Sequence, residues 1–331
     1  MSAVLLGAAC SRPSPHMVHR EEPHMGTTVA ITVVAPTDAE GYRALEAGFA
    51  EVAHMDAVFS NYRQDSDLAR VNRQAGKGPA TVPEVFVDLT RRSLDMVRIS
   101  GGAFNPLVEP AVKLWGIPQT PRVPTEAQLA VLRHLTDPAN VRVTADSVEL
   151  VHPGMSIGFG AIAKGYTADR VTALLRARGI RAGIVAVAGD VRAFGHRPDG
   201  APWHIGVRPP RGDGPDAQPL DTLEMTDGAV STSGDYERFF EIDGVRYHHI
   251  LDPRTLWPSK GVRSVTVRAP DGATADGLAT ALFVIGPDAG VPLAESLPGV
   301  SALFVDQAGR VIASRGWPGR RVTDSEFLSG S

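Results

Sequence analysis

Hairpin patterns interrupt the alternation of helices and strands along this 331-residue chain. Residues 141–151 (VRVTADSVELV) and 302–314 (ALFVDQAGRVIAS) each hold two short apolar runs around a turn, and residues 238–253 do so around Asp243-Gly244. A tight turn joins only antiparallel strands, whereas parallel strands need a long crossover. The sequence therefore predicts an α+β fold with an antiparallel sheet, in preference to a doubly wound parallel sheet.

Hydrophobic periodicity places the remaining elements. Apolar residues recur at helical spacing in long segments, and shorter alternating runs indicate strands. Asp38 is the expected N-cap of the first helix, and Gly179 is the expected end of the fourth. The expected helices are residues 38–60, 83–100, 126–135, 161–180 and 273–286, and further strands are expected within 27–36, 182–195, 203–210 and 263–270.

The composition is that of a soluble globular protein, with 43% hydrophobic and 21% charged residues. A formal net charge of −4 implies no general affinity for nucleic acids or other polyanions. The single cysteine, Cys10, excludes an internal disulfide and a metal site built from several cysteines.

The N-terminal residues suggest export. The start MSAVLLGAACSRPSP has a short apolar run, small residues, Cys10 and then a polar stretch, which is the pattern of a bacterial lipoprotein signal. It lacks a basic n-region, and Gly7 stands where Leu is usual. Residues 1–24 are thus expected to be a signal and tether or a disordered cytoplasmic N-terminus, residues 25–318 one catalytic domain, and residues 319–331 a tail.

Two helix starts carry candidate site residues. Glycines surround the start of the helix at 161–180, with Lys164 in its first turn, an arrangement that suits phosphate or, alternatively, close packing. In the helix at 273–286, Asp276 and Thr280 lie four residues apart and so share one face. Both are hard oxygen donors of the kind that Mg²⁺ binds, although an acid near a helix N-terminus also favours the helix dipole.

Paired histidines form another candidate. His248 and His249 point to opposite faces if the strand continues through them, so at most one faces a given site. A metal site built from both is therefore not expected.

The order of seven segments resembles the ApbE family, the FAD:protein FMN transferases, from residue 25 to about residue 315. The segments are MGTTV (25–29), FSNYRQDSDLARVN (59–72), GGAFNPLVEPAVKLWG (101–116), GAIAKGYTADR (160–170), AGDVRAFGHRPDGAPWHIGVRPP (188–210), STSGDYERFFEIDGVRYHHILDPRT (231–255) and ADGLATALFVIG (275–286). The resemblance implies a T-fold-like α+β enzyme that splits FAD at its pyrophosphate, passes FMN to a Thr or Ser hydroxyl of an acceptor protein and releases AMP.

The resemblance also implies roles for individual residues. His249 matches the histidine near the diphosphate that assists the transfer, and Asp276, Thr280 and the backbone carbonyl of Ala161 match Mg²⁺ ligands. Positions that match FAD contacts are Met25, Tyr62, Ala103, Phe104, Asn105, Lys164 and Ile250.

Acceptors in this family are FMN-carrying subunits of extracytoplasmic redox complexes. Many members are periplasmic lipoproteins, which favours a lipid anchor at Cys10 and an extracytoplasmic location.

The chain departs from the family pattern at several positions. Gly158 stands where Asp is usual, near the adenine and ribose half of FAD, and Asn105 also replaces an Asp. AVAGD (186–190) replaces NAGGD, and Leu256 replaces a Gly. Gly158 and the altered AVAGD segment leave open an FAD-binding carrier without transfer activity. A further alternative is an FAD pyrophosphatase, which uses water in place of the acceptor hydroxyl and gives FMN and AMP.

Overall fold

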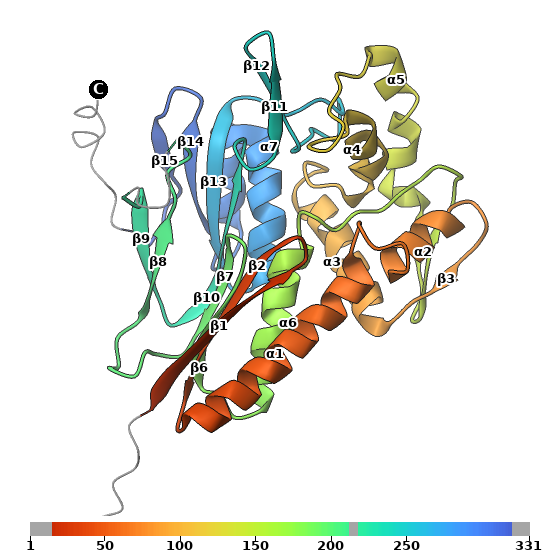
Figure 1. Cartoon of the computed structure of the whole chain (residues 1–331). Coiled ribbons are helices and arrows are strands. Elements are labelled where there is room, and N and C mark those ends of the chain that lie inside the picture. Colours follow the sequence, from red (N-terminus) through yellow and green to blue (C-terminus); the bar gives the residue numbers. More distant parts are fainter. Residues whose placement is uncertain (1–14, 212–217, 320–331) are drawn as a thin grey trace, which may run out of the picture.

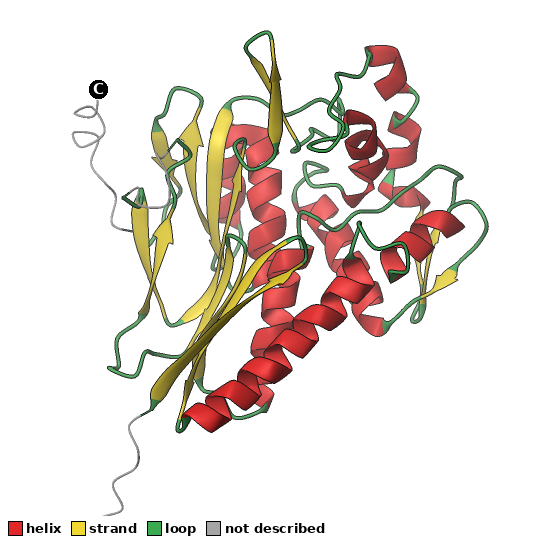
Figure 2. Cartoon of the chain, in the orientation of Figure 1, coloured by secondary structure: helices red, strands yellow, loops and turns green. Residues whose placement is uncertain are grey.

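An eight-stranded antiparallel sheet runs through the computed structural model, which describes residues 15–211 and 218–319 (Figures 1 and 2). Its strand order is β1-β2-β6-β7-β10-β13-β14-β15, and all neighbours are antiparallel. The strands are β1 (His16–His24), β2 (Thr27–Ala35), β6 (Ala182–Val187), β7 (Asp190–Phe194), β10 (Asp227–Gly234), β13 (Val262–Ala269), β14 (Ser301–Asp306) and β15 (Val311–Ala313).

Three long helices cover one face of this sheet, side by side in Figure 1. The helix α1 (Asp38–Phe59) packs on β1 and β2, α6 (Ala163–Ala177) on β6 and β7, and α7 (Gly272–Ser296) on β10, β13 and β14. Alternation along β2 turns Val29, Ile31 and Val33 into the cluster that includes Leu45 and Phe49 of α1. Burial of this alternating apolar face fixes the register of the strand.

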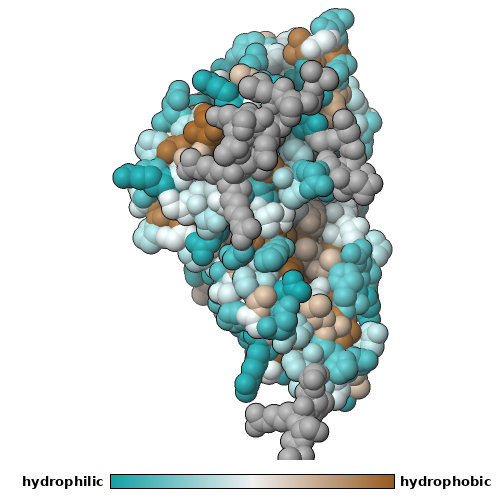
Figure 3. Space-filling view, turned by 90° about the vertical axis from the view of Figure 1, so that its left-hand side faces the viewer, coloured by the Kyte–Doolittle hydropathy of each residue, from teal (hydrophilic) through white to brown (hydrophobic). Residues whose placement is uncertain are grey.

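A short hairpin, β8 (Trp203–Val207) and β9 (Asp221–Met225), covers part of the other face. All six residues of β14 are buried, because Phe304 packs towards α7 while Leu303 and Val305 pack with Trp203 of the hairpin. Figure 3 shows the side of the molecule that is on the left in Figure 1, where the visible surface is mostly hydrophilic with hydrophobic residues between.

A smaller helical part lies beside the sheet. The hairpin β11 (Phe239–Ile242) and β12 (Val245–His248) is held against it, since Trp115 contacts the rings of Phe240, Tyr247 and Trp257. This part contains α2 (Asp67–Gln74), α3 (Glu84–Ile99), α4 (Glu109–Trp115), α5 (Glu126–Ala130), the 3-10 turns Pro106–Val108, Arg133–Thr136 and Pro138–Asn140, and a small sheet of β3 (Ala80–Thr81), β5 (Ser147–Leu150) and β4 (Val141–Val143).

The helix α7 is interrupted at Gly286, whose φ of 74° and ψ of 177° are not helical. This residue ends the apolar segment, as the sequence predicts. The whole of α7 is long and apolar enough to meet a simple criterion for a membrane span. Its packing against α6 and three strands explains that composition, because a helix buried on several sides is apolar all round.

Several sequence predictions are confirmed, and others need correction. The α+β class, the antiparallel sheet and the three hairpins are confirmed. A tether that extends to residue 24 is wrong, because residues 16–24 form β1, paired with β2 along its whole length. The side chain that caps α1 belongs to Thr37, whose hydroxyl accepts the Glu40 N–H, and Asp38 is the first helical residue. Residues 1–14, with Cys10, and residues 320–331 lie outside the described part of the chain.

The close crossing of α6 and α7 gives a stability prediction. A Cβ on Gly165 would lie 2.0 Å from the carbonyl oxygen of Gly272 and 2.9 Å from the Cβ of Asp276. Gly165→Ala must therefore push the two helices apart and should lower the free energy of unfolding by about 2–3 kcal/mol, as overpacking does. Urea denaturation measures this change.

Gly160→Ala is the matched control, since a Cβ on Gly160 meets nothing within 4 Å. It should change the free energy of unfolding by less than about 0.5 kcal/mol. Equal stability of the two variants would mean that the helices tolerate a wider spacing.

Candidate active site

A cavity of about 850 Å³ opens between the helical part and the sheet. The predicted site residues that line it are Met25, Ala103, Phe104, Asn105, Ala161, Lys164, His249, Ile250, Asp276 and Thr280. Tyr62 does not line it: its side chain is 60% exposed and lies beside Gly26 and Arg238, which do. The fold thus brings residues from five distant segments of the chain to one cavity.

Asp276 is a buried carboxylate in the first turns of α7. Two carboxylates cap the start of this helix: the N-cap Asp271 accepts the N–H of Thr274, and Asp169 accepts the N–H groups of Gly272 and Ala273, at 2.7 and 2.9 Å. One oxygen of Asp276 accepts the backbone N–H of Gly165 from α6, at 3.1 Å. Burial and the nearby Asp190 raise the pKa of Asp276 to about 7.

Thr280 lies one turn further along α7 and also faces the cavity. Its hydroxyl is 3.3 Å from that of Ser233 on β10. The cavity therefore holds hydroxyl and carboxylate oxygens together on its α7 side.

Lys164 forms an ion pair with Asp190, which is buried at the start of β7. Asp190 also accepts a hydrogen bond from the hydroxyl of Ser231. Burial acts against the charged form of Lys164, but Asp190 and Asp276 raise its pKa above the ordinary value for lysine. Lys164 is therefore a fixed positive charge in the cavity at neutral pH.

His249 and His248 occupy different environments, as the alternation of a strand predicts. His248 is buried, with Nε2 2.9 Å from the carbonyl oxygen of Ser259 and its ring against Phe283. His249 lines the cavity, and its Nδ1 is 3.2 Å from the carbonyl oxygen of Arg238.

The contact with the Arg238 carbonyl assigns the proton of a neutral His249 ring to Nδ1. Burial and the positive charges of Arg238 and Lys164 lower the pKa of His249 to about 3. The ring is thus neutral at pH 7, and Nε2 is the nitrogen able to accept a proton.

Apolar and aromatic groups line another part of the cavity. Phe104 and Ile250 are both buried, and Met25 sits in the β1–β2 turn with a φ of 52°. The side chain of Asn105 is already bonded on both sides, since its oxygen accepts the Leu107 N–H at 2.9 Å and its amide donates to the Thr136 carbonyl at 2.8 Å. Asn105 therefore shapes the cavity wall as well as lining it.

Several cavity residues were missed at the sequence level. Asp190 pairs with Lys164, which is 26 positions away in the sequence, and no local pattern predicts that contact. Asp190 lies behind the lining, whereas Glu109, Arg208, Ser233 and Arg238 line the cavity itself. Of these residues, only Asp190 belongs to a segment that the sequence analysis singled out, AVAGD (186–190), where the chain departs from the family pattern.

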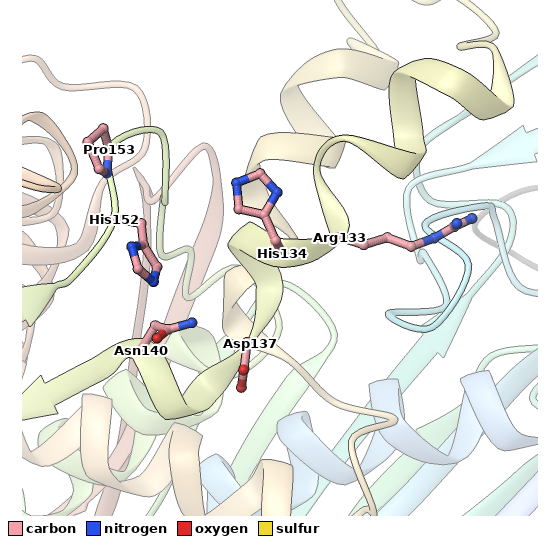
Figure 4. Close-up of a pocket in the computed structure, with 6 residues that line it drawn as sticks. All are labelled: Arg133, His134, Asp137, Asn140, His152 and Pro153. Carbon is pink, nitrogen blue, oxygen red and sulfur yellow. The ribbon is translucent and has the colours of Figure 1, made fainter.

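A second hollow lies on the surface of the helical part, lined by Arg133, His134, Asp137, Asn140, His152 and Pro153 (Figure 4). Figure 4 shows Arg133 pointing away from His152. The described residues contain no group of three or more His, Cys, Asp or Glu that could hold a metal ion. We assign no ligand to this hollow.

The cavity thus combines oxygen donors, a fixed cation, a neutral histidine and an apolar wall within an α+β fold. The ApbE family model matches residues 25–304. The FAD:protein FMN transferase of Treponema pallidum (strain Nichols) is 37% identical, with 98% of this chain and 94% of that protein covered. The enzyme of the same name from Vibrio cholerae serotype O1 is 33% identical, with 89% of each chain covered.

Solved structures agree with this similarity. The ApbE protein of Thermotoga maritima has a TM-score of 0.84 and 33% identity, with 91% of this chain and 97% of that chain covered. The apo form of the Pseudomonas stutzeri flavinyl transferase ApbE has a TM-score of 0.80 and 31% identity, covering 91% and 95%. The chain belongs to the ApbE family. The predicted family, fold class and enzyme class, a transferase, are confirmed.

The buried pair of Lys164 and Asp190 gives a second prediction. Asp190→Asn leaves the ammonium group with less compensation in a partly buried place, so the free energy of unfolding should fall by about 2 kcal/mol. Chemical denaturation at pH 7 measures the loss.

The control is Asp65→Asn, which removes the partner of Arg63 in a pair that is half or more exposed on both sides. An exposed pair contributes little, so this variant should show no measurable loss. If both variants unfold like the unmodified chain, the Lys164–Asp190 pair does not stabilise the fold.

Proposed function

We propose that this chain transfers FMN from FAD to a Thr or Ser hydroxyl of an acceptor flavoprotein, with Mg²⁺, and releases AMP. The observation that carries the proposal is the convergence of Lys164, His249, Asp276 and Thr280 on one cavity in an ApbE fold. The names of the relatives, FAD:protein FMN transferase, support the choice of donor and of transferred group.

The donors on the α7 side fit a magnesium ion. A carboxylate from Asp276, a hydroxyl from Thr280 and the backbone carbonyl of Ala161 are hard oxygen ligands, and all three residues line the cavity. The buried carboxylate of Asp190 lies close enough to raise the pKa of Asp276, an effect that a bound cation would oppose. Mg²⁺ keeps waters and takes phosphate oxygens, so a few protein ligands suffice.

When bound, Mg²⁺ would neutralise charge on the diphosphate of FAD. The other tasks fall to residues of the chain. Lys164 supplies a second positive charge for the phosphates, and Phe104 and Ile250 supply an apolar wall for the flavin ring.

In this proposal His249 takes the proton of the acceptor hydroxyl. In the proposed step the hydroxyl oxygen forms a bond to the FMN phosphorus, and the bond from that phosphorus to the bridging oxygen breaks. The hydroxyl proton passes to Nε2 of neutral His249, and AMP leaves with the electron pair of the broken bond.

The transfer assay tests this proposal with FAD, Mg²⁺ and an FMN-acceptor domain, followed by detection of covalent flavin fluorescence on a denaturing gel. Asp276→Asn removes the charged ligand. A metal supplies several kcal/mol to such a reaction, so labelling should slow by about 100-fold or more. Asp288→Asn, on an exposed position of the same helix, is the matched control and should label like the unmodified chain.

Other outcomes would favour the alternatives. FAD binding without a labelled acceptor or AMP would identify a carrier. FMN and AMP that form without any acceptor would identify a pyrophosphatase. Equal labelling by Asp276→Asn and the unmodified chain would contradict the metal site.

We also propose that the enzyme is exported and anchored through a lipid on Cys10, and that its acceptor is an FMN-carrying subunit of an extracytoplasmic redox complex. The support is the sequence around Cys10 and its position ahead of β1, which begins at His16. The chain expressed in a bacterial host should incorporate labelled palmitate and sediment with membranes.

Cys10→Ser should abolish the palmitate label and move the protein to the soluble fraction, because the thiol is the site of lipidation. Ser11→Ala is the control and should leave both readouts unchanged. An unmodified chain that is unlabelled and cytoplasmic would contradict the proposed anchor.

A further inference from the structure

Glu109, the first residue of α4, places a largely buried carboxylate in the cavity wall. Its side chain is only 13% exposed, and its one charged neighbour is Lys113, whose Nζ lies 4.0 Å from Oε1. Within residues 15–211 and 218–319, no group donates a hydrogen bond to this carboxylate. Burial raises the pKa of Glu109 to about 7, against the opposing effect of Lys113. Partial burial of a charge costs free energy, which a hydrogen-bond donor on a ligand would offset.

Gly158 provides the space that this carboxylate occupies. A Cβ on Gly158 would lie 2.4 Å from Oε2 and 3.1 Å from Cδ of Glu109. The φ angle of Gly158 is outside the left-handed region, so its backbone conformation does not require glycine. The absence of a side chain at Gly158 leaves the space that the carboxylate of Glu109 occupies.

The backbone around Gly158 is held in place. The N–H of Gly158 donates to the carbonyl of Pro106 at 2.8 Å. The side chain of Asn72 bonds both the N–H and the carbonyl of Ile157, at 2.8 and 2.9 Å. A side chain at position 158 would therefore displace the carboxylate of Glu109 before it displaced this backbone.

The charges in the cavity limit which part of a ligand the carboxylate of Glu109 can contact. The cations of the cavity, Lys164, Arg208 and Arg238, suit the diphosphate of a dinucleotide, whereas a carboxylate repels it. Glu109 must then face an uncharged part of the ligand that carries hydrogen-bond donors, such as sugar hydroxyls or a base N–H.

We propose that Glu109, in the space left by Gly158, is a specificity-determining residue that accepts a hydrogen bond from a hydroxyl or N–H group of the bound dinucleotide. The assignment rests on the proposed function, because the dinucleotide is FAD. It requires that the carboxylate, and not merely the volume of the side chain, determines affinity.

The test compares binding of FAD, FMN and AMP to the full chain in the presence of Mg²⁺ by titration calorimetry. Glu109→Gln should weaken FAD binding about tenfold or more, since hydrogen bonds to charged groups are worth about 1.5–3 kcal/mol. If Glu109→Gln weakens the binding of AMP or of FMN by the same factor, the hydrogen-bond donor belongs to that half of FAD. The double variant Glu109→Ala/Gly158→Asp returns a carboxylate from the opposite wall and should recover most of the FAD affinity.

Lys113→Gln is the control, and it is compared with the unmodified chain at a pH well above 7, because Lys113 lowers the pKa of Glu109 and only there does the carboxylate stay ionised without it. It should bind FAD within about threefold of the unmodified chain, a change under about 0.7 kcal/mol. Thermal unfolding of ligand-free Glu109→Gln should show no loss of stability, which a purely structural role would produce.

Unchanged FAD binding by Glu109→Gln overturns the assignment and leaves the proposed function standing. A loss for FAD that neither half reproduces, or that Lys113→Gln matches, also overturns it. If the unmodified chain does not bind FAD, the proposed function fails, and this assignment fails with it.

Discussion

The close crossing of α6 and α7 is the contact on which the cavity depends. Their first turns approach so closely that a Cβ on Gly272 would lie 2.3 Å from the carbonyl oxygen of Gly165. Asp169 of α6 holds the first N–H groups of α7, and Asp276 of α7 in turn accepts the N–H of Gly165. Each helix therefore satisfies backbone groups or fills space at the start of the other, and Lys164 and Asp276 come together as a consequence.

This crossing also explains how one small volume holds several charges. Asp190 arrives from β7, Lys164 from α6 and Asp276 from α7, so three different elements carry the charges. The positive group lies near both carboxylates, which raises its pKa and limits their mutual repulsion. One lysine between two acids leaves negative charge on the α7 side of the cavity, which a cation can complement.

Sequence reasoning succeeded where the signal was local or ordered along the chain. The period of 2 in the hairpins gave the antiparallel class, and the i, i+4 spacing placed Asp276 and Thr280 on one face. It failed where the cause was tertiary. Residues 16–24 (HMVHREEPH) are mostly polar and show no regular alternation, and only their pairing with β2 makes them a strand. Asp190 and Glu109 are likewise recognised as site residues only by their contacts with Lys164 and Gly158 in other parts of the chain, which no local pattern predicts.

The effect of the glycine at position 158 can be interpreted only from its neighbours in the fold. Along the sequence it is the loss of a carboxylate, and that loss motivated the hypothesis of a carrier without transfer activity. In space the same volume contains a carboxylate, which Glu109 supplies from α4. Glu109 and Gly158 are 49 positions apart in the sequence. The carboxylate of Glu109 fits into this space only because Gly158 has no side chain. The charge lining this wall therefore does not distinguish a carrier from a transferase, and the distinction rests on the groups around Asp276.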